Sequence, residues 1–295
     1  MTNKETRGYI NGIISGISFG LIPLFSIPVI AEGMGNVSIL FYRFLFGSAG
    51  MLILLLYRKT SLRVSWGDIA RISLLSVFYN GTALATLECY HYLSSGVATA
   101  LVYTDPIWCA IIGLLFMGDK LSGKIAVSIF TASLGVMMLT DVFSETACFS
   151  AVGVTWGLLS GLSYALYLIF LPRMRMKDMP SLKLTFYVFF LGMIYLGLFD
   201  IVAEGGIEPV RNATTCINLI LLGLIPTALS NICVTMSLKL IDSTIVAILG
   251  ALEPLTAMVI GVLFLNDPFG TDTLMGALLI LAAVGILTVR KKGLR

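Results

Sequence analysis

The chain of 295 residues is 58% hydrophobic and only 12% charged, and its mean hydropathy is +0.97. Soluble domains carry about 25% charged residues, so these values exclude a soluble globular protein and indicate an integral membrane protein. The net charge of +3 does not indicate a nucleic-acid partner, because the basic residues lie in short loops between apolar runs.

The first residues, MTNKETRGYI, are polar and lead directly into an apolar span, so we expect a first helix here rather than a cleavable signal peptide. Apolar runs long enough to cross a bilayer then recur along the whole chain. In chain order they predict ten transmembrane helices, at residues 9–30, 37–57, 70–92, 95–117, 124–141, 153–172, 183–202, 216–238, 243–265 and 272–290.

The basic residues predict how these helices are oriented. Lys and Arg are enriched in the cytoplasmic loops of membrane proteins. With the N-terminus inside, all but two of the 19 Lys and Arg residues fall in inner segments; the exceptions are Arg43, within the second span, and Arg211, in an outer loop. Ten helices with both termini cytoplasmic are therefore predicted.

The chain also repeats itself. GIISGIS from Gly12 matches GLLSGLS from Gly157, and FYRFLFG from Phe41 matches FYVFFLG from Phe186. Each half therefore holds five predicted helices, at residues 1–148 and 149–295. Because five is odd, the second half enters the membrane inverted. An all-α protein with a 5+5 inverted-topology repeat is an architecture typical of secondary transporters.

The fourth helix of each half carries the most specific pattern. It reads SSGVATALVYTDPIWCAIIGLLFMGDKLS in the first half and STIVAILGALEPLTAMVIGVLFLNDPF in the second. With SGISFG, SGLSYA and FYRF, these segments resemble the EamA-type branch of the drug/metabolite transporter superfamily over essentially the whole chain. The acid that follows this helix is usually Glu in that family, but here it is Asp119 and Asp267.

The resemblance implies a helical bundle with a central cavity lined by helices one, three, four, six, eight and nine. It also implies transport by alternating access between the two sides of the membrane. It does not fix the substrate, because members carry amino acids, aromatic compounds, nucleotide sugars and other metabolites in either direction.

Two acidic residues interrupt the apolar fourth helices. Asp105 and Glu253 are expected near the midplane, where each costs roughly 2.5–3.5 kcal/mol on insertion scales and normally faces the bundle interior or a wet cavity. Desolvation favours the neutral acid, which suits a proton-coupling residue or a partner for a cationic group. The alternative is a neutral acid that hydrogen-bonds a nearby backbone carbonyl.

A proline follows each acid. Pro106 and Pro254 remove the backbone hydrogen bonds that would reach the carbonyls of Val102 and Gly250. We expect each proline to kink its helix and to provide a bending point for gating. A static bend required only for packing is the alternative.

Polar and aromatic residues at similar depth complete the predicted site. Glu88 and Arg43 form either a structural ion pair or part of the site, and His91 is expected at the interface. Every fourth residue from Gly8 to Gly20 is glycine, a ridge that allows close helix packing. The remaining cavity candidates combine rings with amides, which need partners in hydrocarbon: Tyr79, Asn80, Tyr103, Trp108, Asn231, Phe19 and Tyr164. Packing against neighbouring helices or lipid is the alternative for each ring.

Neither a metal nor a cofactor is expected. One histidine is too few for a histidine-based metal site, and the scattered cysteines form no CxxC pair. No P-loop, HExxH or Ser-centred elbow occurs, so the chain is not predicted to be an enzyme or an ATP-driven pump.

The sequence therefore predicts a multi-pass secondary transporter of the cell membrane. The expected cargo is a small organic solute, either an amino acid or a cationic or aromatic metabolite, with proton coupling as an open option. A passive channel or facilitator is the main alternative, and a membrane enzyme or scramblase lacks a catalytic cluster. Monomer and homodimer both remain open.

Overall fold

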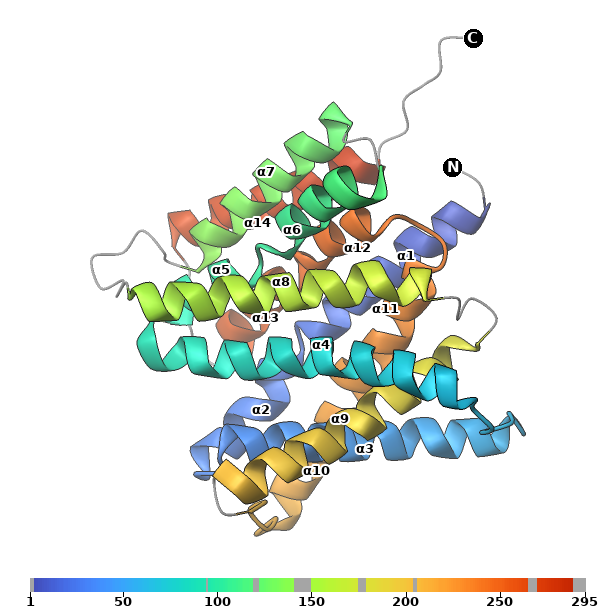
Figure 1. Ribbon diagram of the computed structural model, residues 1–295. Coiled ribbons are helices and arrows are strands. Elements are labelled where there is room, and N and C mark those ends of the chain that lie inside the picture. Colours follow the sequence, from blue (N-terminus) through green and yellow to red (C-terminus); the bar gives the residue numbers. More distant parts are fainter. Residues whose placement is uncertain are drawn as a thin grey trace.

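The computed structural model describes residues 3–93, 95–118, 122–140, 150–174, 179–203, 206–264 and 270–288, and within these ranges the chain forms helices and no strands. The helices, shown in Figure 1, are α1 Asn3–Phe19, α2 Ile22–Ala31, α3 Asn36–Tyr57, α4 Trp66–Tyr92, α5 Ser95–Val102, α6 Asp105–Ile112, η1 Gly113–Met117, α7 Gly123–Leu139, α8 Ala151–Arg173, α9 Ser181–Ala203, α10 Ala213–Leu222, η2 Gly223–Leu229, α11 Ser230–Leu238, α12 Ser243–Gly250, α13 Leu252–Phe264 and α14 Thr271–Thr288.

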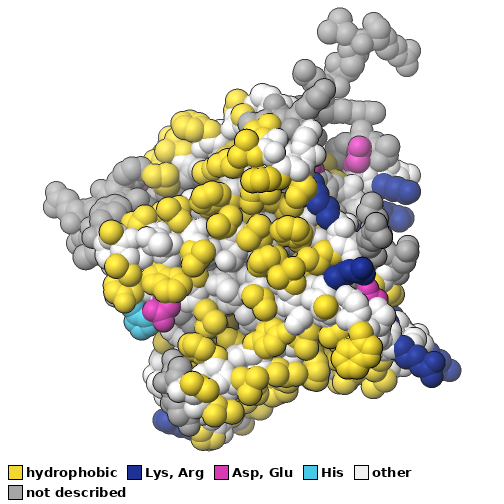
Figure 2. All heavy atoms as spheres, in the orientation of Figure 1, with side chains coloured by type: hydrophobic (Ala, Val, Ile, Leu, Met, Phe, Trp, Pro, Cys, Tyr) yellow, Lys and Arg dark blue, Asp and Glu magenta, His cyan; other side chains and the backbone are white. Residues whose placement is uncertain are grey.

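The surface is that of a multi-pass membrane protein. Among the described residues, seven helical segments are long and apolar enough to cross a bilayer, and two shorter apolar helices accompany them. Large apolar side chains such as Phe116, Phe130 and Leu263 are more than 60% exposed, which suits contact with lipid and not with water. Figure 2 shows apolar side chains spread over the face of the bundle.

The bundle has two chemically different ends. Lys and Arg side chains gather mainly at the edge of Figure 2 where α1 and α4 begin and where α3 and α8 end. We call this the basic end; it carries Arg58, Lys59, Arg63, Arg71, Arg173 and Lys183. The opposite end holds the ends of α2 and α4 and the starts of α3 and α10.

Several predicted spans are unbroken helices with nearly the predicted bounds. The span predicted at 37–57 is α3, that at 153–172 is α8, and that at 183–202 is α9. Helix α4 begins before the predicted residue 70 because Ser65 caps it, accepting a hydrogen bond from the Asp68 N–H at 3.1 Å.

Other predicted spans are broken near their middle. The first is interrupted at Gly20 and Leu21, between α1 and α2. The fourth is interrupted at Tyr103 and Thr104, where Pro106 occupies the first turn of α6. Proline is tolerated there because the first helical N–H groups have no intrahelical acceptor. The break in the fourth span lies where a proline kink was predicted, whereas the break in the first span was not predicted.

Glycines bring α1 into close contact with the broken helix α12–α13. A Cβ on Gly16 would lie 2.9 Å from the Leu249 carbonyl oxygen, and one on Gly20 would lie 2.6 Å from the Glu253 carbonyl oxygen. The Ser237 hydroxyl donates to the Gly8 carbonyl at 2.8 Å. Helix α1 therefore packs backbone to backbone against the segment that carries Glu253.

A second seam joins α8 to the broken helix α5–α6. A Cβ on Gly161 would lie 2.5 Å from the Thr104 hydroxyl and 2.9 Å from the Val102 carbonyl oxygen. The Cys89 thiol donates to the Gly153 carbonyl at 3.3 Å. Helix α8 thus covers the carbonyl that Pro106 leaves without its helical donor.

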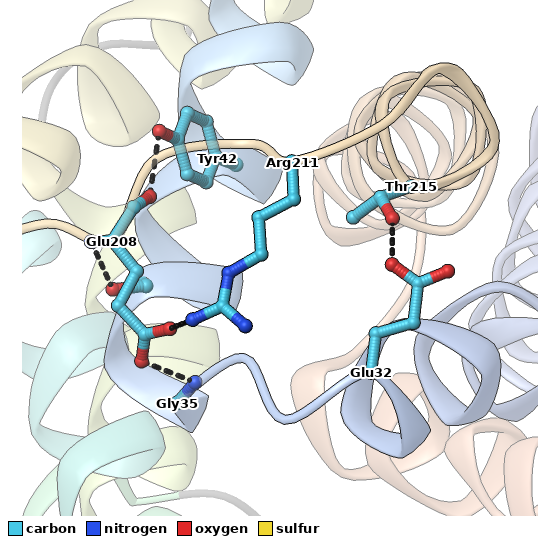
Figure 3. A network of polar contacts seen from close by, with 7 residues as sticks. Glu32, Gly35, Tyr42, Glu208, Arg211 and Thr215 are labelled. Carbon is cyan, nitrogen blue, oxygen red and sulfur yellow. Dashed lines mark hydrogen bonds and ion pairs between the residues drawn. The ribbon is translucent and has the colours of Figure 1, made fainter.

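A polar network ties the loop after α2 to the segment before α10 at the opposite end (Figure 3). A carboxylate oxygen of Glu208 accepts from the Gly35 N–H at 2.8 Å, and its other oxygen lies 3.8 Å from Arg211. Glu32 accepts from the Thr215 hydroxyl and from Asn212. These bonds hold α2 and α10 together beside the apolar contact that they share.

Candidate functional site

A cavity of about 860 Å³ lies between the two broken helices. Its wall is built from segments distant in the chain, because α1, α2, α3, α4, α8, α10 and α11 all contribute alongside α5–α6 and α12–α13. The polar and aromatic side chains of this wall are Ser15, Phe19, Ser26, Asn36, Arg43, Phe44, Tyr79, Thr82, Thr86, Thr99, Tyr103, Asp105, Thr140, Tyr164 and Glu253.

The cavity extends toward one end of the bundle only. Its wall includes Ile30, Asn36 and Thr140, which belong to helix ends at the opposite end, and the first two are exposed. Toward the basic end the wall stops at Leu168, Val234 and Val246. Beyond them lies a continuous buried apolar cluster that includes Tyr167, Leu171, Leu184 and Leu238. Water and solute can therefore enter from the opposite end, while the basic end is sealed.

Both predicted acids reach this cavity, but in different environments. Asp105 is only 3% exposed and occupies the first position of α6, where the positive end of the helix dipole favours a carboxylate. Glu253 lies in the first turn of α13 and is partly exposed to the cavity. Tyr103 lies beside Glu253 in the same wall.

Arg43 brings a positive charge to the same cavity. Its Nε donates to the Thr227 hydroxyl of η2 at 2.6 Å, and that hydroxyl donates onward to the Leu222 carbonyl at 2.8 Å. The guanidinium lies within electrostatic reach of Glu253. Arg43 and Glu88 do not form the ion pair that the sequence left open, and Glu88 is not part of the cavity wall.

Aromatic rings line part of the cavity, and the candidates Tyr79, Tyr164 and Phe19 all belong to its wall. The Tyr79 ring centroid lies 6.4 Å from that of Tyr164 and 5.8 Å from that of Phe44, in tilted and edge-on arrangements. Such pairs hold ring positions well, because offset and edge-on contacts are preferred over face-to-face stacking.

The two predicted amides lie behind this wall. The Asn80 amide nitrogen donates to the Ser76 carbonyl at 2.7 Å, and that of Asn231 donates to the Thr227 carbonyl at 2.9 Å. Asn231 also reaches the Tyr79 hydroxyl at 3.4 Å. Asn231 therefore contacts the wall residue Tyr79, and neither amide belongs to the cavity wall itself. The amide oxygens of both residues are buried without a hydrogen-bond partner among the described residues.

Four further predicted positions remain, one in the wall and three outside it. Pro254 belongs to the wall, whereas Pro106 is buried beside it. Trp108 packs against the apolar cluster, and its indole N–H is buried without a partner in the described part of the chain. His91 is exposed at the end of α4, at the edge of the bundle where an interfacial residue was expected.

Sequence reasoning missed several polar residues. Thr82, Thr86 and Thr99 belong to the wall, and the spacing of the first two on one face of α4 was a usable signal. Asp200 was also missed, although it is an acidic residue inside a predicted apolar helix, as Asp105 and Glu253 are. It is 1% exposed, and both carboxylate oxygens lack a hydrogen-bond partner within the described residues.

The described residues contain no group of three His, Cys, Asp or Glu side chains that could hold a metal ion. What the cavity does provide is one guanidinium, two carboxyls, hydroxyls and aromatic rings in a space of small-molecule size. A helical membrane bundle with such a cavity, open toward one end, is the arrangement of a membrane transporter.

Comparison with known proteins assigns the family. Residues 6–141 and 151–289 each match the EamA-like transporter family, so the chain belongs to that family. An uncharacterized transporter of Archaeoglobus fulgidus is 24% identical over 280 residues, covering 92% of this chain and 93% of the relative. A second uncharacterized transporter of the same organism is 24% identical over 241 residues, covering 78% of this chain and 81% of the relative.

A solved structure supports the same fold. A crystal structure described only as that of a protein superimposes with a TM-score of 0.83 at 14% identity, covering 96% of both chains. The chain is therefore a multi-pass transporter of the cell membrane that works in a lipid bilayer on small solutes.

Proposed function

We propose that the protein is a secondary transporter that carries a small organic solute by alternating access. The observation that carries this proposal is the cavity of about 860 Å³, which reaches the opposite end of the bundle and is sealed at the basic end by apolar residues. A cavity closed at one end must be opened there by a conformational change before solute can leave.

The proposed topology is ten spans in two inverted halves, residues 1–148 and 149–295, with both termini cytoplasmic. The two family matches, one in each half, support it. The basic end would be cytoplasmic, because Lys and Arg gather there. The cavity would then face the outside of the cell.

Matching contacts in the two glycine seams support the inverted repeat. Gly12 meets Leu249 across the first seam, and Gly157 meets Leu101 across the second. The same correspondence relates the two bonds to glycine carbonyls, from Ser237 to Gly8 and from Cys89 to Gly153. Each half thus packs its first helix against the third and fourth helices of the other half.

In the proposed site, Glu253 and Asp105 are the polar anchors for a cationic group, Glu253 by direct contact and the more buried Asp105 as the acid that supports it. Tyr103 orients Glu253, and Tyr79, Tyr164 and Phe19 shape the apolar side. Asn80, Asn231 and Trp108 act from behind the wall, and Pro106 and Pro254 provide the bending points. An amino acid or another small cationic or aromatic metabolite suits this set, because carboxylates and ring faces both attract ammonium groups. Proton coupling through the acids is part of the proposal.

Counterflow in liposomes tests the proposal. Purified protein is reconstituted with a panel of unlabelled amino acids and amines inside, and uptake of each labelled solute is followed. We expect saturable uptake that is stimulated by the same solute on the other side. Uptake that never saturates and shows no such stimulation would favour the passive channel. Unchanged rates and pH dependence in both Asp105→Asn and Glu253→Gln would remove the acids from the site.

A further inference from the structure

Arg43 is the one basic side chain in the wall of the cavity formed by the described residues. A cation inside an apolar bundle is costly and is normally paired with a carboxylate. Arg43 has no ion pair: the described ion pairs are Arg71 with Asp68 and Arg211 with Glu208. Its charge therefore lacks the direct partner that this environment demands.

The hydrogen bonding of Arg43 leaves the two terminal nitrogens of its guanidinium group available. Only Nε is engaged, by Thr227 at 2.6 Å, and this bond fixes the orientation of the planar group. The two terminal nitrogens make no hydrogen bond within the described part of the chain. A guanidinium held this way presents paired donors that match the two oxygens of a carboxylate.

We infer that Arg43 is the anion-binding residue of the cavity and holds a carboxylate group of the solute opposite Glu253. The inference rests on the proposed transport function and refines its substrate class. Solutes that carry a carboxylate and an amino group on one small apolar frame would meet both charges of the wall at once. Glu253 and Asp105 disfavour a phosphate dianion, since each added negative charge near a carboxylate raises the electrostatic cost.

Three probes that share a phenyl ring but differ in charge test the inference. L-phenylalanine carries both a carboxylate and an amine, phenethylamine lacks the carboxylate, and 3-phenylpropanoate lacks the amine. Binding to detergent-purified protein is measured by thermal shift and by tryptophan fluorescence. In Arg43→Gln we expect affinity for both carboxylates to fall at least about tenfold, the loss of one charge-assisted hydrogen bond, while affinity for phenethylamine is kept. Arg43→Lys should lie between.

Two control variants separate charge from folding. Thr227→Val removes the bond that orients the guanidinium but leaves the cation, so carboxylates should bind less tightly than to the native protein yet remain preferred, unlike in Arg43→Gln. Arg71→Gln removes a cation from the exposed Arg71–Asp68 pair and should change nothing. Equal losses for all three probes in Arg43→Gln would overturn the inference, as would failure of both carboxylates to bind the native protein.

The outcomes also separate this inference from the transport proposal. If the carboxylates bind in the expected pattern but counterflow is absent, Arg43 keeps its role and alternating access fails. If counterflow occurs for amines alone and is indifferent to Arg43→Gln, transport stands and the anion-binding role is overturned.

Discussion

The two acid–proline breaks occupy corresponding places in the two halves but are built differently. In the first, Tyr103 and Thr104 separate α5 from α6, and Gly161 of α8 presses on the break. In the second, Ala251 alone separates α12 from α13, and a Cβ on Gly250 would meet nothing within 4 Å. A glycine of a neighbouring helix covers each break on one side, Gly161 of α8 at the first and Gly16 of α1 at the second, but the second also has open space beside Gly250.

The acids follow the same difference. Asp105 is 3% exposed, but Glu253 is partly exposed and has Tyr103 and Arg43 near its carboxyl. Asp105 and Glu253 look equivalent in the sequence but therefore have different proposed roles. Glu253 is placed to meet a solute, and Asp105 is placed to support the wall.

The largest expected effect comes from Glu253→Gln. Loss of a charge-assisted contact costs about 1.5–3 kcal/mol, which is roughly a 10- to 100-fold loss of apparent affinity in counterflow. Binding of phenethylamine should fall in parallel, since the variant removes the partner of the ammonium group. An effect smaller than that of Asp105→Asn would break the comparison.

Gly161→Ala tests the packing of α8 on the first break. The new methyl group would lie 2.5 Å from the Thr104 hydroxyl, and such overpacking costs typically about 1–3 kcal/mol. Thermal inactivation in detergent should occur at a clearly lower temperature. Gly285→Ala is the matched control, because a Cβ there meets nothing within 4 Å. It should be neutral or slightly stabilising, and equal losses in both variants would contradict the packing account.

Asp105→Asn should have a smaller effect on transport. The amide keeps the shape and hydrogen-bonding capacity of the buried carboxyl, so the cost is that of a neutral hydrogen bond, about 0.5–1.5 kcal/mol. Apparent affinity in counterflow should fall only a few-fold. A loss as large as that in Glu253→Gln would assign both acids to direct solute contact.

The smallest effect is expected at the opposite end. Glu208→Gln keeps the acceptor for the Gly35 N–H and removes the exposed pair with Arg211, which lies 3.8 Å away. Exposed ion pairs contribute about 0–1 kcal/mol, so counterflow and thermal stability should change little. A strong effect on the transport rate with unchanged stability would assign the network of Figure 3 to gating.

Much of the fold could be predicted from the sequence, because apolar runs and proline positions are local signals. The bounds of α3 and α8 and the breaks at Pro106 and Pro254 follow from them. The cavity was predictable only in part. The acids and tyrosines stand out against apolar neighbours, but which face of a helix meets the cavity depends on helix packing.

The amides illustrate this limit. Asn80 and Asn231 looked like cavity residues because an amide in hydrocarbon needs a partner. In the structure each amide nitrogen donates to the carbonyl four residues earlier, while the amide oxygen stays buried without a partner among the described residues. Conversely, the bond from Arg43 to Thr227 joins residues far apart in the chain, so no local sequence pattern predicts it.

The central claim, alternating access to the cavity, is tested most directly by cysteine labelling from the two sides of the membrane. Ala257→Cys places a thiol in the cavity wall, and Leu238→Cys places one in the sealed cluster; the native protein gives the background. A membrane-impermeant maleimide should label Ala257→Cys from the opposite end. It should label Leu238→Cys from the basic end, and only during turnover. Labelling of Ala257→Cys from both sides at equal rates that solute does not alter would contradict the account.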